Sequence, residues 1–305
     1  MKAIVIANPQ SGKPLIGRKK WRFCSIIEKE IFNAWILFTE PEGERSPERL
    51  ASFAQKEGFD FIIVRGGDGT VSRVINGLDF SKKVPVLALM PAGTGNDFAY
   101  ALGLRCSLSQ NLEVIKKRKT ISVDLGVVRF GDQERRFVNT VSVGIDAEVN
   151  NLAHRLAPYL RKIGMFRFAY VIAALGRMIY RLHFPEVVIE IDGKRKVKGP
   201  ISLATVTNSY RYGGGFKINP SARLDDGILN LCIAQPISRI LIPYFVIKMK
   251  QGTHPTSSIF SFHCFQNLII KSDTALPIQI DGEECPSQNY LGVSVLPKAL
   301  RVLVP

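Results

Sequence analysis

The feature that most limits the fold of this chain is a theme that occurs three times in its first third. An apolar run leads into a loop rich in Gly, Asn and Asp, and a helical period follows. The three cases are residues 2–7 with "NPQSGKP", residues 59–64 with "RGGDGT", and residues 84–90 with "PAGTGN". This alternation predicts parallel strands joined by right-handed crossover helices. The three loops would then share the carboxyl edge of one sheet, where open α/β sheets bind ligands.

The middle loop has the properties of an anion site. "GGDGT" at residues 66–70 precedes apolar residues at helical spacing, and "NG" at residues 76–77 would end that helix. Free backbone N–H groups and the positive end of the helix dipole collect at such an N-terminus. Glycine lets the backbone approach a phosphate closely. A plain turn is the alternative, but chance gives this five-residue string at only about 10⁻⁶ per position.

Asp68, within this loop, would repel a bound phosphate unless a cation lay between them. Hard divalent cations such as Mg²⁺ prefer carboxylate, phosphate and water oxygens. The aspartate therefore predicts magnesium together with a nucleotide.

The first loop falls short of a P-loop signature, which would need glycine at Ala7 and a hydroxyl at Pro14. A P-loop NTPase is therefore disfavoured. Asn8, Ser11 and the backbone of Gly12 can still contact a nucleotide. A structural turn explains the loop equally well, because Asn, Pro, Ser and Gly are all turn formers.

The composition limits which partners the protein can bind and in which cellular compartment it can reside. Forty-one Lys and Arg against 26 Asp and Glu leave a formal charge of +15, which suits polyphosphate, nucleic acid or an anionic membrane surface. The five cysteines never form C-x-x-C, so neither a disulfide framework nor a zinc site is indicated, and a reducing compartment fits. No stretch reaches the roughly 20 uncharged apolar residues of a spanning helix. We expect a cytoplasmic protein, soluble or peripheral to a membrane.

The pattern changes after residue 120 to short β segments separated by Gly, Pro, Asn and Asp turns. These segments are residues 187–191, 201–207, 228–234, 268–271 and 278–280. Such spacing is typical of a β-sandwich rather than a second βαβ array. With 305 residues, the chain can hold two domains with their own cores.

Several motifs together resemble a known family. "NPQSG", "GGDGT" and "PAGTGNDFA", in this order, closely resemble the catalytic domain of diacylglycerol kinases and the small bacterial lipid kinases related to them. "FVNTVSVGIDAEV" at 137–149, "NSYRYGGGFKINPSARLDDGILNL" at 208–231 and "IQIDGEE" at 278–284 agree with this resemblance, which covers nearly the whole chain. NAD kinases and phosphofructokinases also use a GGDG loop, but their other motifs have no counterpart here.

The resemblance implies an α/β nucleotide-binding domain with a parallel sheet, of the NAD kinase and diacylglycerol kinase type, and a β-sandwich second domain. The first would span residues 1–120, completed by the C-terminal segment 296–305, and the lipid-substrate domain would span 121–295, with the active site in the cleft between them. The ATP-binding residues that it implies are Asn8, Thr39, Gly66, Gly67, Asp68, Gly69, Thr70, Val71, Ser72 and Thr94.

The resemblance also implies two magnesium sites. Asp68 and Asp97 would organise the catalytic Mg²⁺, although an acid in a first helical turn, as at Asp97, is also explained by capping. A structural Mg²⁺ would be held in "SARLDDGIL" by the carboxylate of Asp226 and the main-chain carbonyls of Arg223 and Ile228. A plain D-D-G turn is the alternative there.

The block "IQIDGEE" supplies candidates for the carboxylate that takes the proton of an acceptor hydroxyl in phosphoryl transfer. If the strand continues through Gly282, the side chains of Asp281 and Glu283 point to the same side. By analogy with the bacterial members, Glu283 is the proton acceptor and Asp281 its catalytic partner, with Asp68 as the third catalytic carboxylate. A hairpin turn with solvated acids is the alternative.

Residues 161–184 interleave cations with apolar residues. The cations are Arg161, Lys162, Arg167, Arg177 and Arg181. Such a surface can rest on anionic headgroups at the inner face of a membrane. A core-facing helix with its arginine heads in solvent is the alternative.

These observations predict an ATP- and Mg²⁺-dependent lipid kinase, with diacylglycerol as the first substrate and phosphatidylglycerol or a sphingoid lipid as other options. "NSYR" before "YGGG" and Tyr100 depart from the family pattern and leave the lipid undecided. The alternatives are a soluble-substrate kinase of the NAD kinase type and a non-catalytic ATP-binding sensor. Nucleic-acid binding is not expected, because no aromatic RNA platform or helix-turn-helix signal accompanies the charge. A homodimer is left open.

Overall fold

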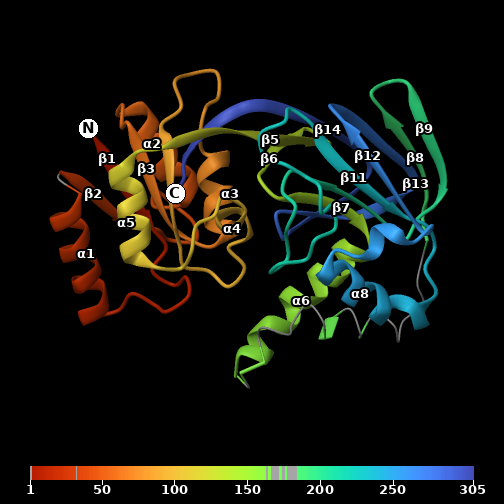
Figure 1. Cartoon of the computed structure of the whole chain (residues 1–305), viewed down its shortest axis with the longest axis horizontal. Helices are drawn as coiled ribbons and strands as arrows, with labels where there is room; N and C mark the ends of the chain where they lie inside the picture. The colour runs from red at the N-terminus through yellow and green to blue at the C-terminus, as the bar shows by residue number, and fades with distance from the viewer. Residues whose placement is uncertain (1, 32, 163, 166–171, 174–175, 177–183) are drawn as a thin grey trace. The chain divides into compact units, whose positions relative to one another are not determined.

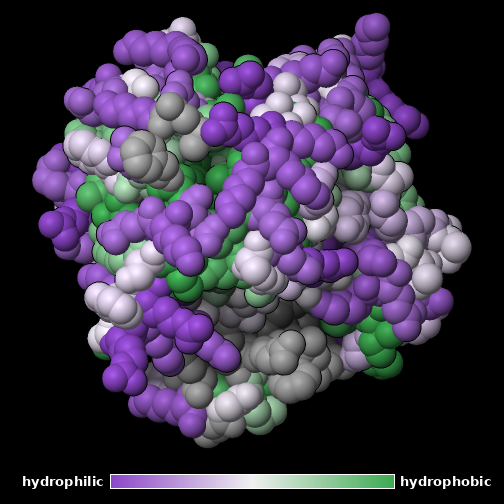
Figure 2. All heavy atoms as spheres, turned by 60° about the vertical axis from the view of Figure 1, so that its left-hand side comes forward, coloured by the Kyte–Doolittle hydropathy of each residue, from purple (hydrophilic) through white to green (hydrophobic). Residues whose placement is uncertain are grey.

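The structure is a computed structural model that describes residues 2–31, 33–162, 164–165, 172–173, 176 and 184–305. The chain divides into two compact units, one of Met1–Val123 with Lys298–Pro305 and one of Asp124–Pro297 (Figure 1). Hydrophilic side chains cover much of one face of the molecule in Figure 2, as expected for a chain with a formal charge of +15.

The first unit is a parallel sheet with helices between its strands, as the alternating pattern predicts. Its strands follow the order β2 (Ala34–Phe38), β1 (Ala3–Ala7), β3 (Phe61–Gly66) and β4 (Val86–Pro91). The last residues of β14 (Glu283–Leu303) extend this sheet, since Val302 pairs in parallel with Leu87 of β4. Strands β1 and β4 are buried along their whole length, which is expected where both faces of a parallel sheet are covered.

Helices connect the parallel strands of the first unit. They are α1 (Arg18–Glu30), α2 (Pro47–Lys56), α3 (Asp68–Asn76), α4 (Asp97–Ala101) and α5 (Leu108–Lys117). The hydroxyl of Ser46 caps α2, with Pro47 in its first turn, and the hydroxyl of Ser107 caps α5. The predicted apolar face of α3 is confirmed, because Val71, Val74 and Ile75 are buried.

The second unit is built of antiparallel strands. They are β5 (Thr120–Phe130), β6 (Gln133–Phe137), β7 (Thr140–Gly144), β8 (Glu186–Ile191), β9 (Arg195–Pro200), β10 (Leu203–Thr207), β11 (Leu229–Ala234), β12 (Phe260–Phe265), β13 (Asn267–Ile280) and the first part of β14. The order along the main path is β12-β11-β10-β7-β13-β14, and β9 pairs with β8.

Strand β13 makes this unit a sandwich. Residues 268–272 of β13 pair with β8, while residues 278–280 pair with β7, and the register shifts in between. One long strand therefore pairs with β8 along one part and with β7 along another, where the sequence suggested two separate short strands. The buried core of this sandwich-like unit includes Phe137, Val141, Ile189, Leu231, Ile270 and Leu291.

The helical elements of the second unit with described bounds are two α-helices and two short 3₁₀ turns. They are α6 (Ile145–Lys162), the short 3₁₀ turns η2 (Arg239–Leu241) and η3 (His254–Thr256), and α8 (Ile242–Gln251). In the part of the chain that the structure describes, no helix is long and apolar enough to cross a membrane. The predicted basic surface at residues 161–184 lies largely outside the described residues, including Arg167, Arg177 and Arg181.

Candidate active site

Three loops meet at the carboxyl edge of the first unit's sheet, because β1 and β4 flank β3 in parallel. The N–H of Asn8 donates to the carbonyl of Arg65 at 2.8 Å, and the N–H of Ala92 donates to the carbonyl of Gly66 at 2.8 Å. The side-chain amide of Asn8 donates to Thr70 Oγ1 at 3.1 Å. The structure thus brings together residues of all three loops that the sequence singled out.

Glycine allows these loops to pack backbone against backbone. A Cβ on Gly67 would lie 3.1 Å from the Cα of Gly93, and a Cβ on Gly93 would lie 2.5 Å from the Cα of Gly67. Gly12 has a φ of +64°, and a Cβ there would lie 2.0 Å from the carbonyl oxygen of Ala92. Side chains at these positions would push the loops apart. The result is a backbone-lined edge at the N-terminus of α3, which suits the phosphates of a nucleotide.

Asp68 links two helix starts within this edge. Its carboxylate accepts hydrogen bonds from the N–H of Asp97 at 3.0 Å and from the N–H of Phe98 at 3.1 Å. It therefore caps α4, and Asp97 is buried in the first turn of that helix.

The donor set at this edge fits Mg²⁺ if the nucleotide completes it. Asp68 and Asp97 offer hard carboxylate oxygens, the ligand type that Mg²⁺ prefers. Within the described ranges, no group of three or more His, Cys, Asp or Glu side chains could hold a metal ion. The remaining ligands would be phosphate and water oxygens, as is usual for nucleotide-bound magnesium.

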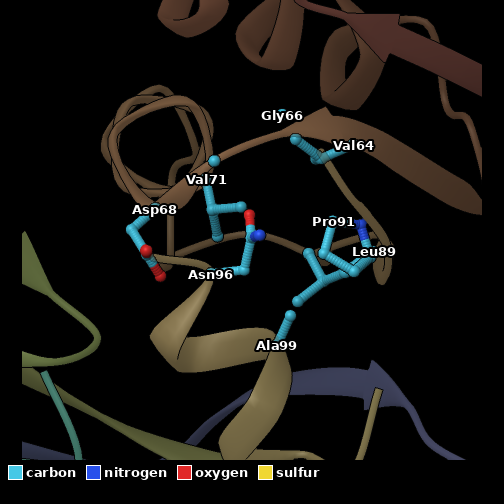
Figure 3. Close-up of a pocket in the computed structure, with 9 residues that line it drawn as sticks. Val64, Gly66, Asp68, Val71, Leu89, Pro91, Asn96 and Ala99 are labelled. Atoms are coloured by element: carbon cyan, nitrogen blue, oxygen red, sulfur yellow. The ribbon is translucent and has the colours of Figure 1, made fainter. Parts of the chain in front are cut away.

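A small cavity of about 10 Å³ lies beneath the glycine loop (Figure 3). This is close to the space that one water molecule needs. Apolar side chains of Val64, Leu89 and Ala99 form part of its wall, while Asp68 and Asn96 lie on another part. Asn96 also braces the third loop, since its side chain bonds both the N–H and the carbonyl of Gly93.

The other predicted ATP-binding residues differ in their exposure. Thr94 is exposed at the tip of the third loop. Thr39 is buried at the end of β2, and its N–H donates to the carbonyl of Ala7 at 2.9 Å. Val71 and Ser72 are buried inside α3, and Ser72 Oγ has no hydrogen-bond partner among the described residues. The last two side chains therefore support the loop from within.

Arg65 is a residue of this site that the sequence analysis missed. It is buried at the end of β3, and its guanidinium donates to the carbonyls of Asn8 at 2.8 Å and Lys13 at 3.4 Å. Burial lowers its pKa, and no carboxylate pairs with it in the described part of the chain. A buried positive charge thus lies against the first loop, between that loop and the ring of Phe23. The only sequence signal was a lone arginine inside an otherwise apolar strand.

In the second unit, the strand does not continue through Gly282, so the condition for Asp281 and Glu283 to point to the same side is not met, and the alternative of a hairpin turn is the one found. Strand β13 ends at Ile280 and β14 begins at Glu283, and these two residues pair with each other. Asp281 and Gly282 form a two-residue hairpin loop with φ values of +48° and +87°. Positive φ at both loop positions matches the right-handed twist of the flanking strands, and "DG" is a preferred sequence for it.

The carboxylate of Asp281 is directed into the protein. It accepts hydrogen bonds from the N–H of Val138 at 3.0 Å, Asn139 at 2.8 Å and Thr140 at 3.0 Å. These bonds attach the hairpin loop to the start of β7. The structure therefore gives Asp281 an anchoring role, and its predicted part in catalysis would act through the position of the loop.

Glu283 lies beside Arg135, with 2.6 Å between Arg135 Nη2 and Glu283 Oε2. Burial lowers the pKa of Arg135, but the hydrogen bond and charge of Glu283 outweigh it, so that this pKa is raised. Within the described residues no group bonds the other oxygen, Oε1, of Glu283. Glu283 is thus a half-buried carboxylate with one oxygen held and one open.

A buried polar network behind the hairpin loop was also missed. Gln279 accepts the N–H of Gly282 at 2.8 Å and donates to Ser142 Oγ at 2.9 Å. Ser142 donates to Asp146, whose other oxygen accepts the hydroxyl of Tyr212 at 2.9 Å. These residues lie in the motif blocks quoted above, but their roles depend on contacts between distant strands.

The loop at residues 225–228 is a turn in which two carboxylates accept backbone N–H groups. The fully buried Asp124 accepts the N–H of Gly227 at 2.7 Å, and Asp226 accepts the N–H of Ile228 at 3.3 Å. Partial burial raises the pKa of Asp226, and the charges of Asp124 and Asp225 raise it further, against the Ile228 hydrogen bond. A cation near Asp226 would relieve this repulsion, and the second magnesium site stays a prediction.

Comparison with known proteins agrees with both units. Residues 2–128 match the diacylglycerol kinase catalytic domain, and residues 139–304 match the YegS C-terminal NAD kinase beta sandwich-like domain. A diacylglycerol kinase of Staphylococcus carnosus is 29% identical over 283 residues, covering 92% of this chain and 88% of the relative. A probable lipid kinase YegS-like of Chromohalobacter salexigens is 30% identical over 261 residues, covering 84% and 80%.

A solved structure supports the fold. A putative diacylglycerol kinase from Bacillus anthracis superposes with a TM-score of 0.76 at 22% identity, covering 100% of this chain and 97% of that one. Fold and glycine-loop site together define a kinase with an α/β phosphate-binding unit and a β-sandwich unit. The chain belongs to the diacylglycerol kinase family of ATP-dependent lipid kinases. The predicted resemblance and fold class are confirmed.

Proposed function

We propose that this protein transfers the γ-phosphoryl group of ATP to a hydroxyl of a membrane lipid, with diacylglycerol as the first candidate. The observation that carries the proposal is the close approach of Gly67 and Gly93 at the N-terminus of α3. Because neither glycine carries a side chain, a phosphate has room beside the two backbone loops. The relatives of this chain bear the names diacylglycerol kinase and lipid kinase. Phosphatidylglycerol and sphingoid lipids are the other acceptors to test.

The donor side of the reaction belongs to the first unit. Backbone N–H groups of residues 66–70 would bind the β- and γ-phosphates, and Asn8 holds Thr70 in place. The guanidinium of Arg65 adds positive charge against the first loop. Thr39, Val71, Ser72 and Thr94 complete the proposed nucleotide site, with Val71 and Ser72 acting as buried support.

The proposal includes Mg²⁺ with the nucleotide. Asp68 and Asp97 would hold it, and when bound it supplies charge neutralisation for the phosphates. A second Mg²⁺ would be held by Asp226 with the carbonyls of Arg223 and Ile228. That position is in a loop of the second unit, so its role would be to fix the loop.

The acceptor side belongs to the second unit. In the proposed step the lipid hydroxyl oxygen forms a bond to the γ-phosphorus, the bond from this phosphorus to the β–γ bridging oxygen breaks, and ADP leaves. The hydroxyl proton passes to Oε1 of Glu283, the oxygen that Arg135 does not hold. Asp281 fixes the hairpin loop that presents Glu283.

The assignment of units is part of the same proposal. Residues 1–120 with 296–305 would be the ATP-binding domain, and residues 121–295 the lipid-substrate domain. We further propose that the protein acts as a peripheral protein at the inner face of a membrane with anionic lipids, and that a homodimer is the assembly to test.

The test is transfer of labelled γ-phosphate from ATP to a panel of lipids in mixed micelles with Mg²⁺. Labelled lipid from the parent, lost in Asp68→Ala and Glu283→Ala, would support the proposal and name the acceptor. A labelled soluble acceptor without labelled lipid would favour a kinase of the NAD kinase type. ATP binding without any transfer would favour a nucleotide sensor.

A further inference from the structure

Helix α8 is apolar on two opposite faces. Its inner face packs into the second unit through the buried residues Ile242 and Phe245, which contact a cluster that includes Tyr212, Phe216 and Ile218. The outer face carries Ile240 and Leu241, from the preceding 3₁₀ turn, followed by Tyr244 and Ile247. These four side chains are 77%, 42%, 52% and 57% exposed, respectively.

The spacing explains why both faces are apolar. Residues 242, 245, 246 and 249 follow the helical period toward the core, with Val246 and Met249 partly buried. Residues 240, 244 and 247 follow the same period on the other side. A surface helix ordinarily has charged or polar residues on its outer face. Four large apolar side chains gathered over one helical segment are therefore unlike the single exposed ones found on most proteins.

The charged residues near this helix in the sequence are mostly positive. Between Asp192 and Asp273 the only carboxylates are Asp225 and Asp226, whereas eleven Lys and Arg occur there. Arg239 begins the segment, Lys248 Nζ lies 5.5 Å from the centre of the Tyr244 ring, and Lys250 donates to the carbonyl of Gly214. Neighbouring loops add further cations, since Lys217 packs against Gly252 and Arg211 approaches Gly215. Helix α6, which packs against Val246, carries Asp146 and Glu148 in its first turn, and Asp146 is buried.

We propose that η2 and α8 form a membrane-docking surface whose occupant is a bilayer rich in anionic lipid. This surface, the α8 face, is defined by Ile240, Leu241, Tyr244, Ile247 and the cations Arg239, Lys248 and Lys250. Its apolar side chains enter the boundary between headgroups and acyl chains, while the cations contact anionic headgroups. Tyr244 suits this depth, because it has an apolar ring and a polar hydroxyl. The excess of eleven cations over two carboxylates in this segment matches an anionic surface better than a basic protein partner.

The inference deepens the proposed function and rests on it only in one respect, that the acceptor lipid resides in a membrane. Docking would hold the second unit at the bilayer between turnovers, so that acceptor lipids reach it by lateral diffusion. Binding to vesicles can be measured without ATP or an acceptor lipid. Failure of the docking surface is therefore distinguishable from failure of the kinase assignment.

The test is sedimentation of the full chain with vesicles of phosphatidylcholine alone and with vesicles of equal parts phosphatidylcholine and phosphatidylglycerol. We expect the parent to bind the anionic vesicles, and we expect Ile240→Ser/Ile247→Ser to weaken that binding about tenfold or more. The matched pair is Tyr244→Ser and Tyr290→Ser. Tyr290 is 44% exposed on β14 and pairs with Lys271 in the sheet, so only the change at Tyr244 should reduce binding.

Three outcomes would overturn the inference. They are no vesicle binding by the parent, equal loss in the Tyr244 and Tyr290 variants, and a parent dimer that the α8 changes dissociate without any change in vesicle binding. The thermal midpoint of each variant is measured alongside. Phosphorylation of a short-chain, water-soluble diacylglycerol should stay at the parental rate in Ile240→Ser/Ile247→Ser, which shows that the loss is one of docking.

Discussion

The carboxylate of Asp68 accepts a hydrogen bond from the backbone N–H of Asp97 at 3.0 Å. The bond ties the first turn of α3 to the first turn of α4, so the loops after β3 and β4 are held as one body. The same carboxylate is the one proposed to approach Mg²⁺. The side chain of Asp68 therefore caps α4 and has a proposed catalytic role as well. Different substitutions of Asp68 can separate these two roles.

Asp68→Ala removes both acceptors that cap α4, so we expect the free energy of unfolding to fall by about 1–3 kcal/mol. Asp68→Asn keeps one oxygen for this cap and should lose less stability. Both variants should lose phosphoryl transfer, because neither carries the charge proposed for the metal. Urea denaturation and labelled-phosphate transfer measure the two effects, with Asp132→Asn in an exposed turn as the control. Parental turnover in Asp68→Asn would contradict the catalytic role.

Arg65→Met should weaken ATP binding while leaving the stability of the protein almost unchanged. A buried charge without a carboxylate partner is costly to fold around, so we expect the unliganded protein to change in stability by no more than about 1 kcal/mol. Loss of the positive charge should weaken ATP binding about tenfold, or about 1.4 kcal/mol. Calorimetric titration with ATP measures the affinity. An unchanged ATP affinity together with a large loss of stability would show that Arg65 is only structural.

Gly93→Ala tests the close approach of the two glycine loops. The added Cβ would lie 2.5 Å from the Cα of Gly67, a backbone atom that cannot move without displacing the loop. We expect ATP binding to be lost while the fold is kept. Gly292→Ala is the matched control, because its Cβ would meet only ordinary contacts at 3.8 Å or more. Equal ATP affinity in the two variants would refute the proposed phosphate edge.

The loop at Asp226 should respond to pH and to Mg²⁺ together. The raised pKa means that the folded protein holds this proton more tightly than the unfolded chain does. Without divalent cation, stability should therefore fall as the pH rises from the ordinary aspartate value through the raised one. Mg²⁺ should restore it at neutral pH in the parent. In Asp226→Asn both effects should be absent, and thermal midpoints across pH with and without Mg²⁺ provide the measurement.

The first unit could be predicted well because its signals are local. An apolar run, a cluster of turn formers and a helical period follow one another along the chain, and each predicts its own element. The approach of Gly67 to Gly93 was not readable, because it depends on how β3 and β4 align in the sheet. The bonds from Arg65 were hidden for the same reason, since they require the first loop to fold back over β3.

In the second unit, local sequence patterns did not determine where strands end or which strands pair. The sequence left open whether the strand at residues 278–280 continues through Gly282 or turns there, and in the structure Asp281 and Gly282 form the turn. The pairing of β13 with both β7 and β8 depends on its registers with these two strands, which come from distant parts of the chain. Glu283 was identified as a candidate from the motif, whereas its partner Arg135 could be found only in the structure.

The most direct test of the account compares two neighbouring glutamates. Glu283→Gln should lower the turnover of lipid phosphorylation by about 10²–10⁴-fold with little change in ATP affinity, because only the proton acceptor is lost. Glu284 pairs with Arg155 and not with Arg135, so Glu284→Gln should retain the parental rate. The measurement is transfer of labelled γ-phosphate to diacylglycerol in mixed micelles with Mg²⁺. Similar rates of lipid phosphorylation in both variants, or no labelled lipid from the parent, would contradict the account.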